Sequence, residues 1–253
     1  MSKLKSRIKP TAIHFIGSIV IAIVMACVVL FLWYPTPYSF MAGGLSLLFI
    51  LISVDVVLGP SLTFVVFDIK KPRDELVRDI TIICFIQLCG LAYGLHTVYV
   101  ARPVALVLEL TQFRVVSALD VKSDELKNVA EQFQSLSLTG PQLFGTRGFK
   151  DKADESDALN KSLAGYDIGT RPSFWQDYDL SKTKALQLSK PVSLLYRKYP
   201  ESKTEIDAAV KRAGIDATQL RFIPIFSLQG DWVALIHPST ARPVAFLEKD
   251  GFF

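Results

Sequence analysis

Cysteine and histidine are scarce in this sequence, with three of each among 253 residues. The cysteines are Cys27, Cys84 and Cys89, so the chain after residue 89 has no disulfide framework available to it. The histidines lie far from one another in the sequence and do not alternate with cysteines at the spacing of zinc ligands. We therefore expect no metal ion and no cofactor.

Sequence motifs of catalysis are also missing. The chain contains no P-loop, no G-x-G-x-x-G and no H-E-x-x-H. After residue 90 its only histidines are His96 and His237, and two isolated imidazoles do not make a catalytic triad. We therefore expect that the protein is not an enzyme.

Charge is scarce and unevenly distributed. Charged residues make up 21% of the chain against 50% hydrophobic residues, and Asp55 is the only charge within three long apolar runs. About 20 apolar residues cross a bilayer, so each run predicts a transmembrane helix. The runs are residues 12–34, 38–67 and 80–100. The second is longer than a bilayer requires, and Gly59 and Pro60 are the expected bend because proline removes a backbone donor and clashes with the preceding turn.

The first run has an alternative interpretation as a cleaved signal. Residues 24–27 resemble a lipoprotein cleavage box that ends at Cys27. The apolar part of a secretory signal spans about 7 to 15 residues, and this run continues well past that length. We therefore expect it to remain as a membrane-spanning helix.

Lysine and arginine predict the orientation of these helices. They cluster before the first run (Lys3, Lys5, Arg7 and Lys9) and between the second and third (Lys70, Lys71, Arg73 and Arg78). By the positive-inside rule both clusters are cytoplasmic, and three crossings export the rest of the chain. The predicted parts are a basic cytoplasmic tail, a three-helix transmembrane region and an exported domain, at residues 1–11, 12–101 and 102–253. The exported part holds 20 Lys and Arg against 19 Asp and Glu, without a clustered basic face, so we expect no nucleic-acid partner.

The pattern after residue 101 predicts an α+β domain with a mainly antiparallel sheet. Two β-rich runs around Thr111 and Gln112 indicate a hairpin, and three closing runs indicate a meander. Ser202 and Glu205 have the spacing of a capping box, and Gly214 is an expected helix stop. The expected strands are residues 104–110, 113–119, 221–228, 232–237 and 244–248. The other expected helices are residues 125–133 after a Ser123 cap, 154–163 and 191–199, with a polar surface excursion over residues 135–157.

The five letters ARPVA occur twice, beginning at Ala101 and Ala241. Proline is tolerated at the first position or on the edge of a strand, so Arg102-Pro103 and Arg242-Pro243 are expected strand starts. The first pair also marks where the chain enters the exported domain. We expect both segments in one sheet.

Asp55 is the most unusual residue of the apolar runs. A charge near mid-bilayer is costly, so its side chain is expected to face other helices rather than lipid. Gln87 on the third run lies at a similar expected depth and is the predicted partner, whereas His14 and His96 are expected toward opposite faces of the membrane. Either Asp55 pins the second and third helices together, or it meets a polar group on a partner's membrane helix.

Several segments together resemble one family. They are VDVVLGPSLTFVVF, FDIKKPRDELVRDI, IQLCGLAYGLHTVYVARPVALVLEL, GPQLFGTR, SLAGYDIGTRPSFW and WVALIHPSTARPVAFL. The chain resembles type IV pilin accessory proteins of the TfpX/TfpZ kind from about residue 43 onward. The resemblance implies a multi-pass inner-membrane protein of a Gram-negative bacterium, with membrane lipid around its helices and a periplasmic domain. It also implies a role in assembly or dynamics of the cognate type IV major pilin. Pilus assembly or alignment subcomplex proteins are implied as further partners. The resemblance carries over no catalytic residues.

Two other functions remain as alternatives. A prepilin peptidase uses membrane-proximal aspartates, and Asp68, Asp74 and Asp79 lie near the predicted cytoplasmic interface, but the G-x-G-D motif is missing. Asp68 and Asp79 are expected to balance the basic loop instead. The second alternative is a membrane-anchored periplasmic sensory or ligand-binding domain that signals through a partner protein.

Overall fold

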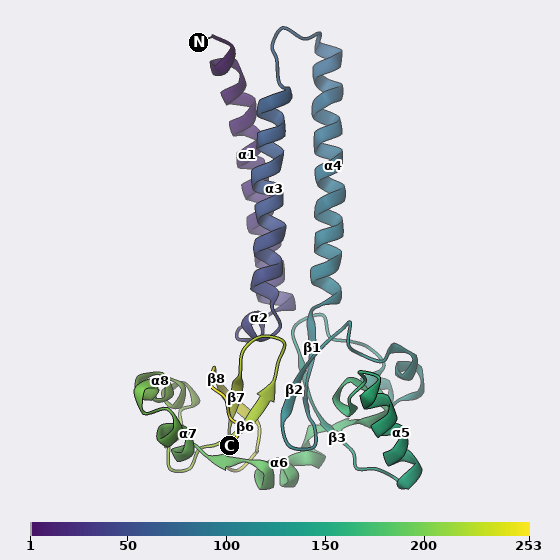
Figure 1. Ribbon diagram of the computed structural model, residues 1–253, viewed down its shortest axis with the longest axis vertical. Helices are drawn as coiled ribbons and strands as arrows, with labels where there is room; N and C mark the ends of the chain where they lie inside the picture. Colours follow the sequence, from purple (N-terminus) through teal and green to yellow (C-terminus); the bar gives the residue numbers. More distant parts are fainter. Residues whose placement is uncertain (1) are drawn as a thin grey trace. The chain divides into compact units, whose positions relative to one another are not determined.

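The computed structural model describes residues 2–253, and within it the chain packs as two units (Figure 1). The first unit comprises residues 2–39 and Gly43–Ala101 and is helical. The second comprises Phe40–Ala42 and Arg102–Phe253 and contains the sheet. We describe each unit by itself.

Three long helices form the first unit. Helix α1 continues into a π-helical segment η1, and a short helix α2 follows before α3 and α4. The bounds are α1 Ser2–Cys27, η1 Val28–Trp33, α2 Tyr38–Met41, α3 Gly44–Val66 and α4 Arg73–Val100. By length and composition, α1 with η1, α3 and α4 are each long and apolar enough to cross a membrane.

Two helix boundaries differ from the sequence prediction. Helix α1 begins at Ser2, so most of the basic segment expected to be a separate tail is part of the helix, with Pro10 inside it. The second apolar run is not one helix, because Gly43 interrupts it in the left-handed region at φ 70°. Only glycine adopts that conformation without a steric cost, so α3 starts after it. Helix α3 then continues through Gly59 and Pro60 to Val66.

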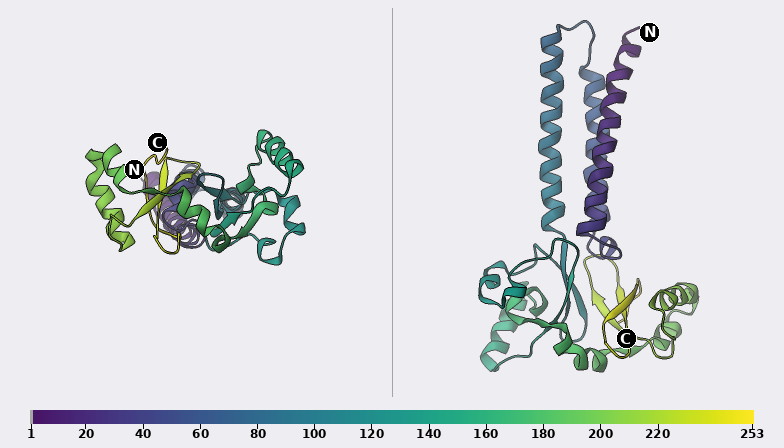
Figure 2. Two further views of the ribbon diagram at one scale, coloured as in Figure 1. Left: turned by 90° about the horizontal axis from the view of Figure 1, so that it is seen from below. Right: turned by 180° about the vertical axis from the view of Figure 1, so that it is seen from behind.

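Helix α3 packs against both α1 and α4 (Figures 1 and 2). Glycine lets α3 and α4 approach closely: a Cβ on Gly94 would lie 2.4 Å from a methyl group of Leu51. Small residues serve this purpose between membrane helices. Near the C-terminal end of α4, the hydroxyl of fully buried Tyr34 donates to the main-chain oxygen of Val98 at 2.9 Å.

The second unit contains one mixed, mostly antiparallel sheet. The strands run in the order β4-β3-β1-β2-β6-β7-β8, and β5 also pairs with β6. Neighbours β1 and β3, and β2 and β6, are parallel, and the other pairs are antiparallel. The strands are β1 Pro103–Leu108, β2 Phe113–Ser117, β3 Gln142–Thr146, β4 Trp175–Asp177, β5 Lys190–Pro191, β6 Arg221–Phe226, β7 Trp232–Ile236 and β8 Pro243–Leu247.

Helices and 3₁₀ turns cover different parts of this sheet. Apolar side chains of α7 and α8, such as Leu195 and Ile206, pack with those of β6, β7 and β8 in one core cluster. Phe133 and Trp175 pack with β1 and β2 in another. The helices are α5 Lys152–Leu163, α6 Lys182–Leu188, α7 Ser193–Lys198 and α8 Lys203–Ala213. The 3₁₀ turns are η2 Ser123–Asn128, η3 Glu131–Phe133, η4 Ile168–Thr170, η5 Pro172–Phe174, η6 Tyr178–Ser181 and η7 Pro200–Ser202.

The hairpin of β1 and β2 and the meander of β6, β7 and β8 confirm the predicted order of these strands. Gly214 ends α8 in the left-handed region as predicted. The capping box is wrong, because the Ser202 side chain makes no cap hydrogen bond and Glu205 pairs with Lys249 at 2.9 Å. Residues 190 and 191 belong to β5 rather than to the predicted helix, which starts at Ser193.

Two other predictions are wrong over residues 123–157. Strand β3 lies in the predicted polar excursion, where it joins the sheet beside β1 and the Thr146 hydroxyl donates to the main-chain oxygen of Leu108 at 2.8 Å. The predicted helix over residues 125–133 is two 3₁₀ turns, because Val129 is extended and interrupts it. The Glu125 carboxylate is held there by tertiary bonds, to Arg171 and Ser173. Helix α6 and strand β4 were not predicted.

Candidate functional site

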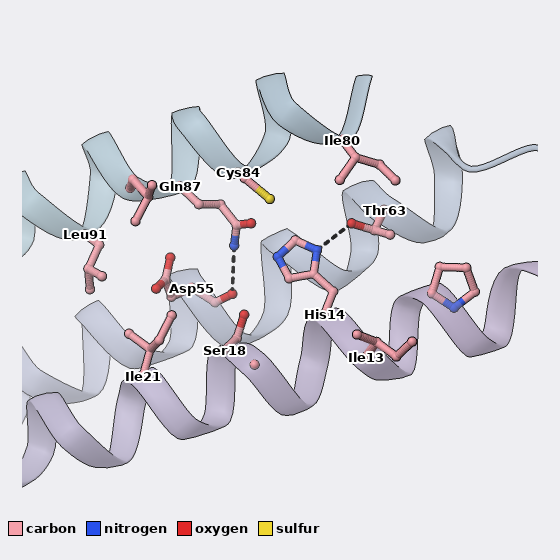
Figure 3. Close-up of a pocket in the computed structure, with 13 residues that line it drawn as sticks. Ile13, His14, Ser18, Ile21, Asp55, Thr63, Ile80, Cys84, Gln87 and Leu91 are labelled. Atoms are coloured by element: carbon pink, nitrogen blue, oxygen red, sulfur yellow. Dashed lines mark hydrogen bonds between the residues drawn. The ribbon is translucent and has the colours of Figure 1, made fainter. Parts of the chain in front are cut away.

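A cavity of about 520 Å³ lies among the three long helices of the first unit (Figure 3). Its walls are mainly apolar, with a few polar side chains among them. The lining residues are Pro10, Ile13, His14, Gly17, Ser18 and Ile21 of α1, Asp55 and Thr63 of α3, and Ile80, Cys84, Gln87, Leu88 and Leu91 of α4.

Helical periodicity brings these residues to one place. Side chains three, four or seven positions apart lie on the same face of a helix. His14, Ser18 and Ile21 follow this spacing on α1, and the lining residues of α4 do so as well. Asp55 and Thr63 are eight positions apart on α3, close to two full turns. Each helix therefore turns one face toward the cavity.

Asp55 and Gln87, which the sequence paired, do meet across this cavity. The Gln87 amide nitrogen donates to the main-chain oxygen of Asp55 at 3.2 Å, as Figure 3 shows. The Asp55 residue is 9% exposed, and its carboxylate lies on the α4 side of the cavity, toward Leu91. The bond reaches the main chain, so it can form whichever side chain occupies position 55.

Gly59 makes room for that bond. The Gln87 side chain passes directly over Gly59, and a Cβ there would lie 1.9 Å from the Gln87 amide nitrogen. Gly59 and Pro60 are both buried within α3. A glycine at this position therefore lets a polar side chain of α4 cross the surface of α3.

His14 is a polar member of the cavity that the sequence prediction did not place there. Its Nδ1 atom lies 2.6 Å from the hydroxyl oxygen of buried Thr63. Thr63 is eight positions from Asp55, about 12 Å along α3, so His14 bonds to Thr63 and not to Asp55, in keeping with the expectation that it is not the partner of Asp55. The spacing of His14 with Ser18 was the signal that could have placed it on the cavity wall. His96 is not part of the lining.

Comparison with known proteins identifies the family. A sequence model of the family "Fimbrial assembly protein FimB" matches residues 2–43. A fimbrial assembly protein of serogroup E1 from Dichelobacter nodosus is 32% identical over 246 residues, which cover 96% of this chain and 95% of that protein. The chain belongs to the fimbrial assembly protein family.

Other relatives support this assignment. The fimbrial assembly protein of serogroup I from the same organism is 31% identical over 96% of this chain and 95% of its own length. That of serogroups C1 and C2 is 41% identical over 118 residues, which cover 47% of this chain and 90% of that protein. No solved structure matches the chain. The segment matched by the family model includes all of α1, and hence the α1 wall of the cavity.

The two Arg-Pro pairs of this family member lie in the second unit. Pro103 begins β1 and Pro243 begins β8, and both strands belong to one sheet, as predicted. Arg102 is 4% exposed and its Nε donates to the main-chain oxygen of Ser137 at 3.1 Å. Arg242 is half-exposed and pairs with Asp179 at 2.7 Å. These contacts are those of packing and surface ion pairing.

The aspartates near the loop between α3 and α4 form local contacts. Asp79 pairs with Lys71 at 2.7 Å, and the Asp68 carboxylate accepts from the main-chain nitrogen of Lys70 at 3.0 Å. Within residues 2–253, no group of three or more His, Cys, Asp and Glu side chains is arranged to hold a metal ion. The cavity, by contrast, offers donors and acceptors in apolar surroundings, which suits contact with a polar group on an apolar partner.

Proposed function

We propose that this protein is an inner-membrane accessory factor for type IV pilus biogenesis, which acts through contacts with its cognate major pilin and not through catalysis. Membership of the fimbrial assembly family supports the role in fimbrial biogenesis. The three long apolar helices and their basic flanks support a membrane location with a cytoplasmic amino terminus and a periplasmic second unit.

The cavity around Asp55 is the observation that carries this proposal. An ionisable residue within a membrane helix costs about 2.5 to 3.5 kcal/mol on insertion scales and is a default indication of function. The bond from Gln87 to the Asp55 main-chain oxygen does not require a carboxylate at position 55. The cavity volume of about 520 Å³ suits a few side chains of a partner helix rather than the whole helix. We infer that a membrane helix of the pilin inserts side chains here, one of which bonds to the Asp55 carboxylate.

Photocrosslinking in the piliated host tests this contact. A photoreactive phenylalanine derivative replaces Leu91, which lines the cavity, or Tyr93, which is 77% exposed on another face of the same helix. The two positions are within one turn and therefore share a depth. We expect a pilin adduct from position 91 and little or none from position 93.

Equal capture of pilin from both positions would contradict the cavity as the contact surface, and capture from neither would contradict the pilin contact.

A strain that lacks this protein tests the proposed role in pilus assembly. We expect it to lose surface pili while prepilin cleavage continues, whereas uncleaved prepilin in that strain would indicate a peptidase.

A further inference from the structure

A second cavity, of about 470 Å³, lies in the second unit beside α5 and is lined almost entirely by charged and polar side chains. Its lining residues are Lys122, Asp124, Glu125, Asn128, Arg147, Asp154, Lys161, Arg171 and Ser173. The function proposed above does not use any of them.

Arg171 is the most buried charged group of this lining, at 4% exposure. Its Nε donates to Glu125 at 2.9 Å and its Nη2 to Asp157 at 3.0 Å. The third nitrogen, Nη1, is buried and has no acceptor within the described residues 2–253. A guanidinium has five N–H donors and no acceptor, so Nη1 can be satisfied only by an acceptor from outside.

Phe174 does not supply that acceptor. The Arg171 guanidinium carbon lies 4.8 Å from the centre of the Phe174 ring, and the Arg147 guanidinium carbon lies 4.1 Å from it. A ring face accepts N–H groups only weakly and does not replace an oxygen acceptor. The ring therefore holds both arginines in place while leaving Nη1 of Arg171 without an oxygen acceptor.

The two arginines come from distant segments with the same local sequence. Both follow Gly-Thr, as Gly145-Thr146-Arg147 at the end of β3 and Gly169-Thr170-Arg171 at the end of η4. Arg147 is itself paired with Asp154 at 2.7 Å. Nη1 of Arg171, the donor without an acceptor, therefore lies where two ordered segments meet. It is not on a flexible surface side chain.

The charge balance indicates which acceptor fits. The lining carries four positive and three negative side chains, and Asp157 outside the lining also pairs with Arg171 and Lys161. A cluster this close to neutral tolerates one added negative charge better than the two of a phosphate group. A bound carboxylate can also replace Asp124 as the partner of Lys122, because Asp124 is 70% exposed and exposed ion pairs contribute little to stability.

We propose that this cavity binds a single carboxylate of a partner polypeptide, with Nη1 of Arg171 as its buried donor and Lys122 and Lys161 as its outer cations. The carboxylate is either an acidic side chain or a chain terminus, both of which offer two acceptor oxygens to a guanidinium. This site is independent of the membrane-helix contact proposed above.

Titration of the full chain in detergent at low ionic strength tests the site. Three acetylated tripeptide probes are compared: Gly-Gly-Gly with a free carboxylate terminus, Gly-Glu-Gly with an amidated terminus, and Gly-Gln-Gly with an amidated terminus. Inorganic phosphate is a fourth probe. We expect saturable binding of at least one of the first two probes and none of the third, and the stronger of the two identifies the source of the carboxylate.

Variants connect binding to this cavity. Arg171→Lys keeps the charge but removes Nη1, and we expect it to weaken binding by a factor of about ten or more because a charge-assisted hydrogen bond is lost. Lys161→Gln leaves Arg171 in place and should weaken binding by a smaller factor. Exposed Lys152, also on α5 but outside the lining, supplies the control Lys152→Gln, which should bind as the unaltered protein does.

Several results would overturn the proposal: equal binding of the glutamine probe, no binding of either carboxylate probe, or tighter binding of phosphate. If Arg171→Lys fails to fold, Lys161→Gln decides, and unchanged binding in that variant also overturns the assignment.

Discussion

Nδ1 of His14 and the hydroxyl oxygen of Thr63 lie 2.6 Å apart, so a side chain of α1 bonds to a side chain of α3 across 49 positions of sequence. This contact lies on the wall of the cavity that also contains Asp55. It joins α1 to α3 on that wall, and the bond from Gln87 to the Asp55 main-chain oxygen joins α3 to α4. Polar contacts therefore connect all three helices around the cavity.

Asp55 should matter for fimbriation more than for folding. Because Gln87 bonds to its main-chain oxygen, both Asp55→Asn and Asp55→Leu should leave α3 and α4 in contact and the protein near its normal abundance. We expect Asp55→Leu to lose most surface fimbriae, and Asp55→Asn to lose fewer because an amide still forms hydrogen bonds. Immunoblots and counts of surface fimbriae measure the two effects. A large fall in abundance for Asp55→Leu alone would show instead that the side chain holds the helices together.

Gly59→Ala should weaken the packing of α3 and α4. The new Cβ would lie 1.9 Å from the Gln87 amide nitrogen, so this side chain must move and the bond to Asp55 is lost. We expect a cost of about 1 kcal/mol, which is that of the lost hydrogen bond, because the Gln87 amide is the flexible end of its side chain and can move aside. Thermal or denaturant unfolding in detergent measures it.

The matched control is Gly90→Ala on α4, where an added Cβ meets nothing within 4 Å. Adding Gln87→Ala to Gly59→Ala should recover part of the loss by removing the group that clashes. Equal stability of the Gly59 and Gly90 variants would contradict this account.

Asp154 should make stability depend on pH in the acid range. Its hydrogen bond from Arg147 lowers its pKa from 3.8 to about 2. A carboxyl whose pKa is lowered by folding stabilises the protein above its unfolded pKa, and this contribution is lost as the pH falls through the folded value. We expect Asp154→Asn to lower the free energy of unfolding by about 1 kcal/mol at pH 7, after allowance for solvent screening.

The difference between Asp154→Asn and the unaltered protein should shrink as the pH falls below about 4 and be nearly gone at about pH 2. Urea unfolding followed by tryptophan fluorescence measures it. Exposed Asp231 supplies the control Asp231→Asn, which should show no such trend. A constant difference at every pH would mean that Asp154 acts by packing alone.

The orientation of the chain can be tested with reporter fusions. Alkaline phosphatase joined after Lys122 should be active, because the reporter folds only when exported and the proposed topology of three crossings places this residue outside the cytoplasm. The same reporter inserted at Arg73 should be inactive, since the basic loop there is retained by the positive-inside rule. The reverse pattern of activities would overturn the proposed topology.

Features that follow from local periodicity and composition could be predicted from the sequence alone. Runs of apolar residues predicted three long helices, and alternating runs predicted the β1–β2 hairpin and the closing meander. Gly214 ended its helix as expected, because a left-handed residue is a local requirement. Asp55 and Gln87 lie opposite each other because antiparallel helices place residues of equal depth side by side, although the bond from Gln87 reaches the Asp55 main-chain oxygen and not the carboxylate for which it was predicted.

Features that depend on contacts between residues distant in sequence could not be predicted from the sequence. Strand β3 escaped prediction because its place is fixed by parallel pairing with β1, and Gly145 is needed there since a Cβ would lie 1.9 Å from the Ser181 hydroxyl. The residues expected to form a helix after Ser123 turn instead toward Arg171, whose bonds to Glu125 come from 46 positions away. The bond of His14 to Thr63 joins two helices across 49 positions of sequence. In each case a hydrogen bond or a close steric contact between residues distant in sequence outweighs the local propensity of the chain. Such contacts leave no periodic pattern in the sequence from which they could be predicted.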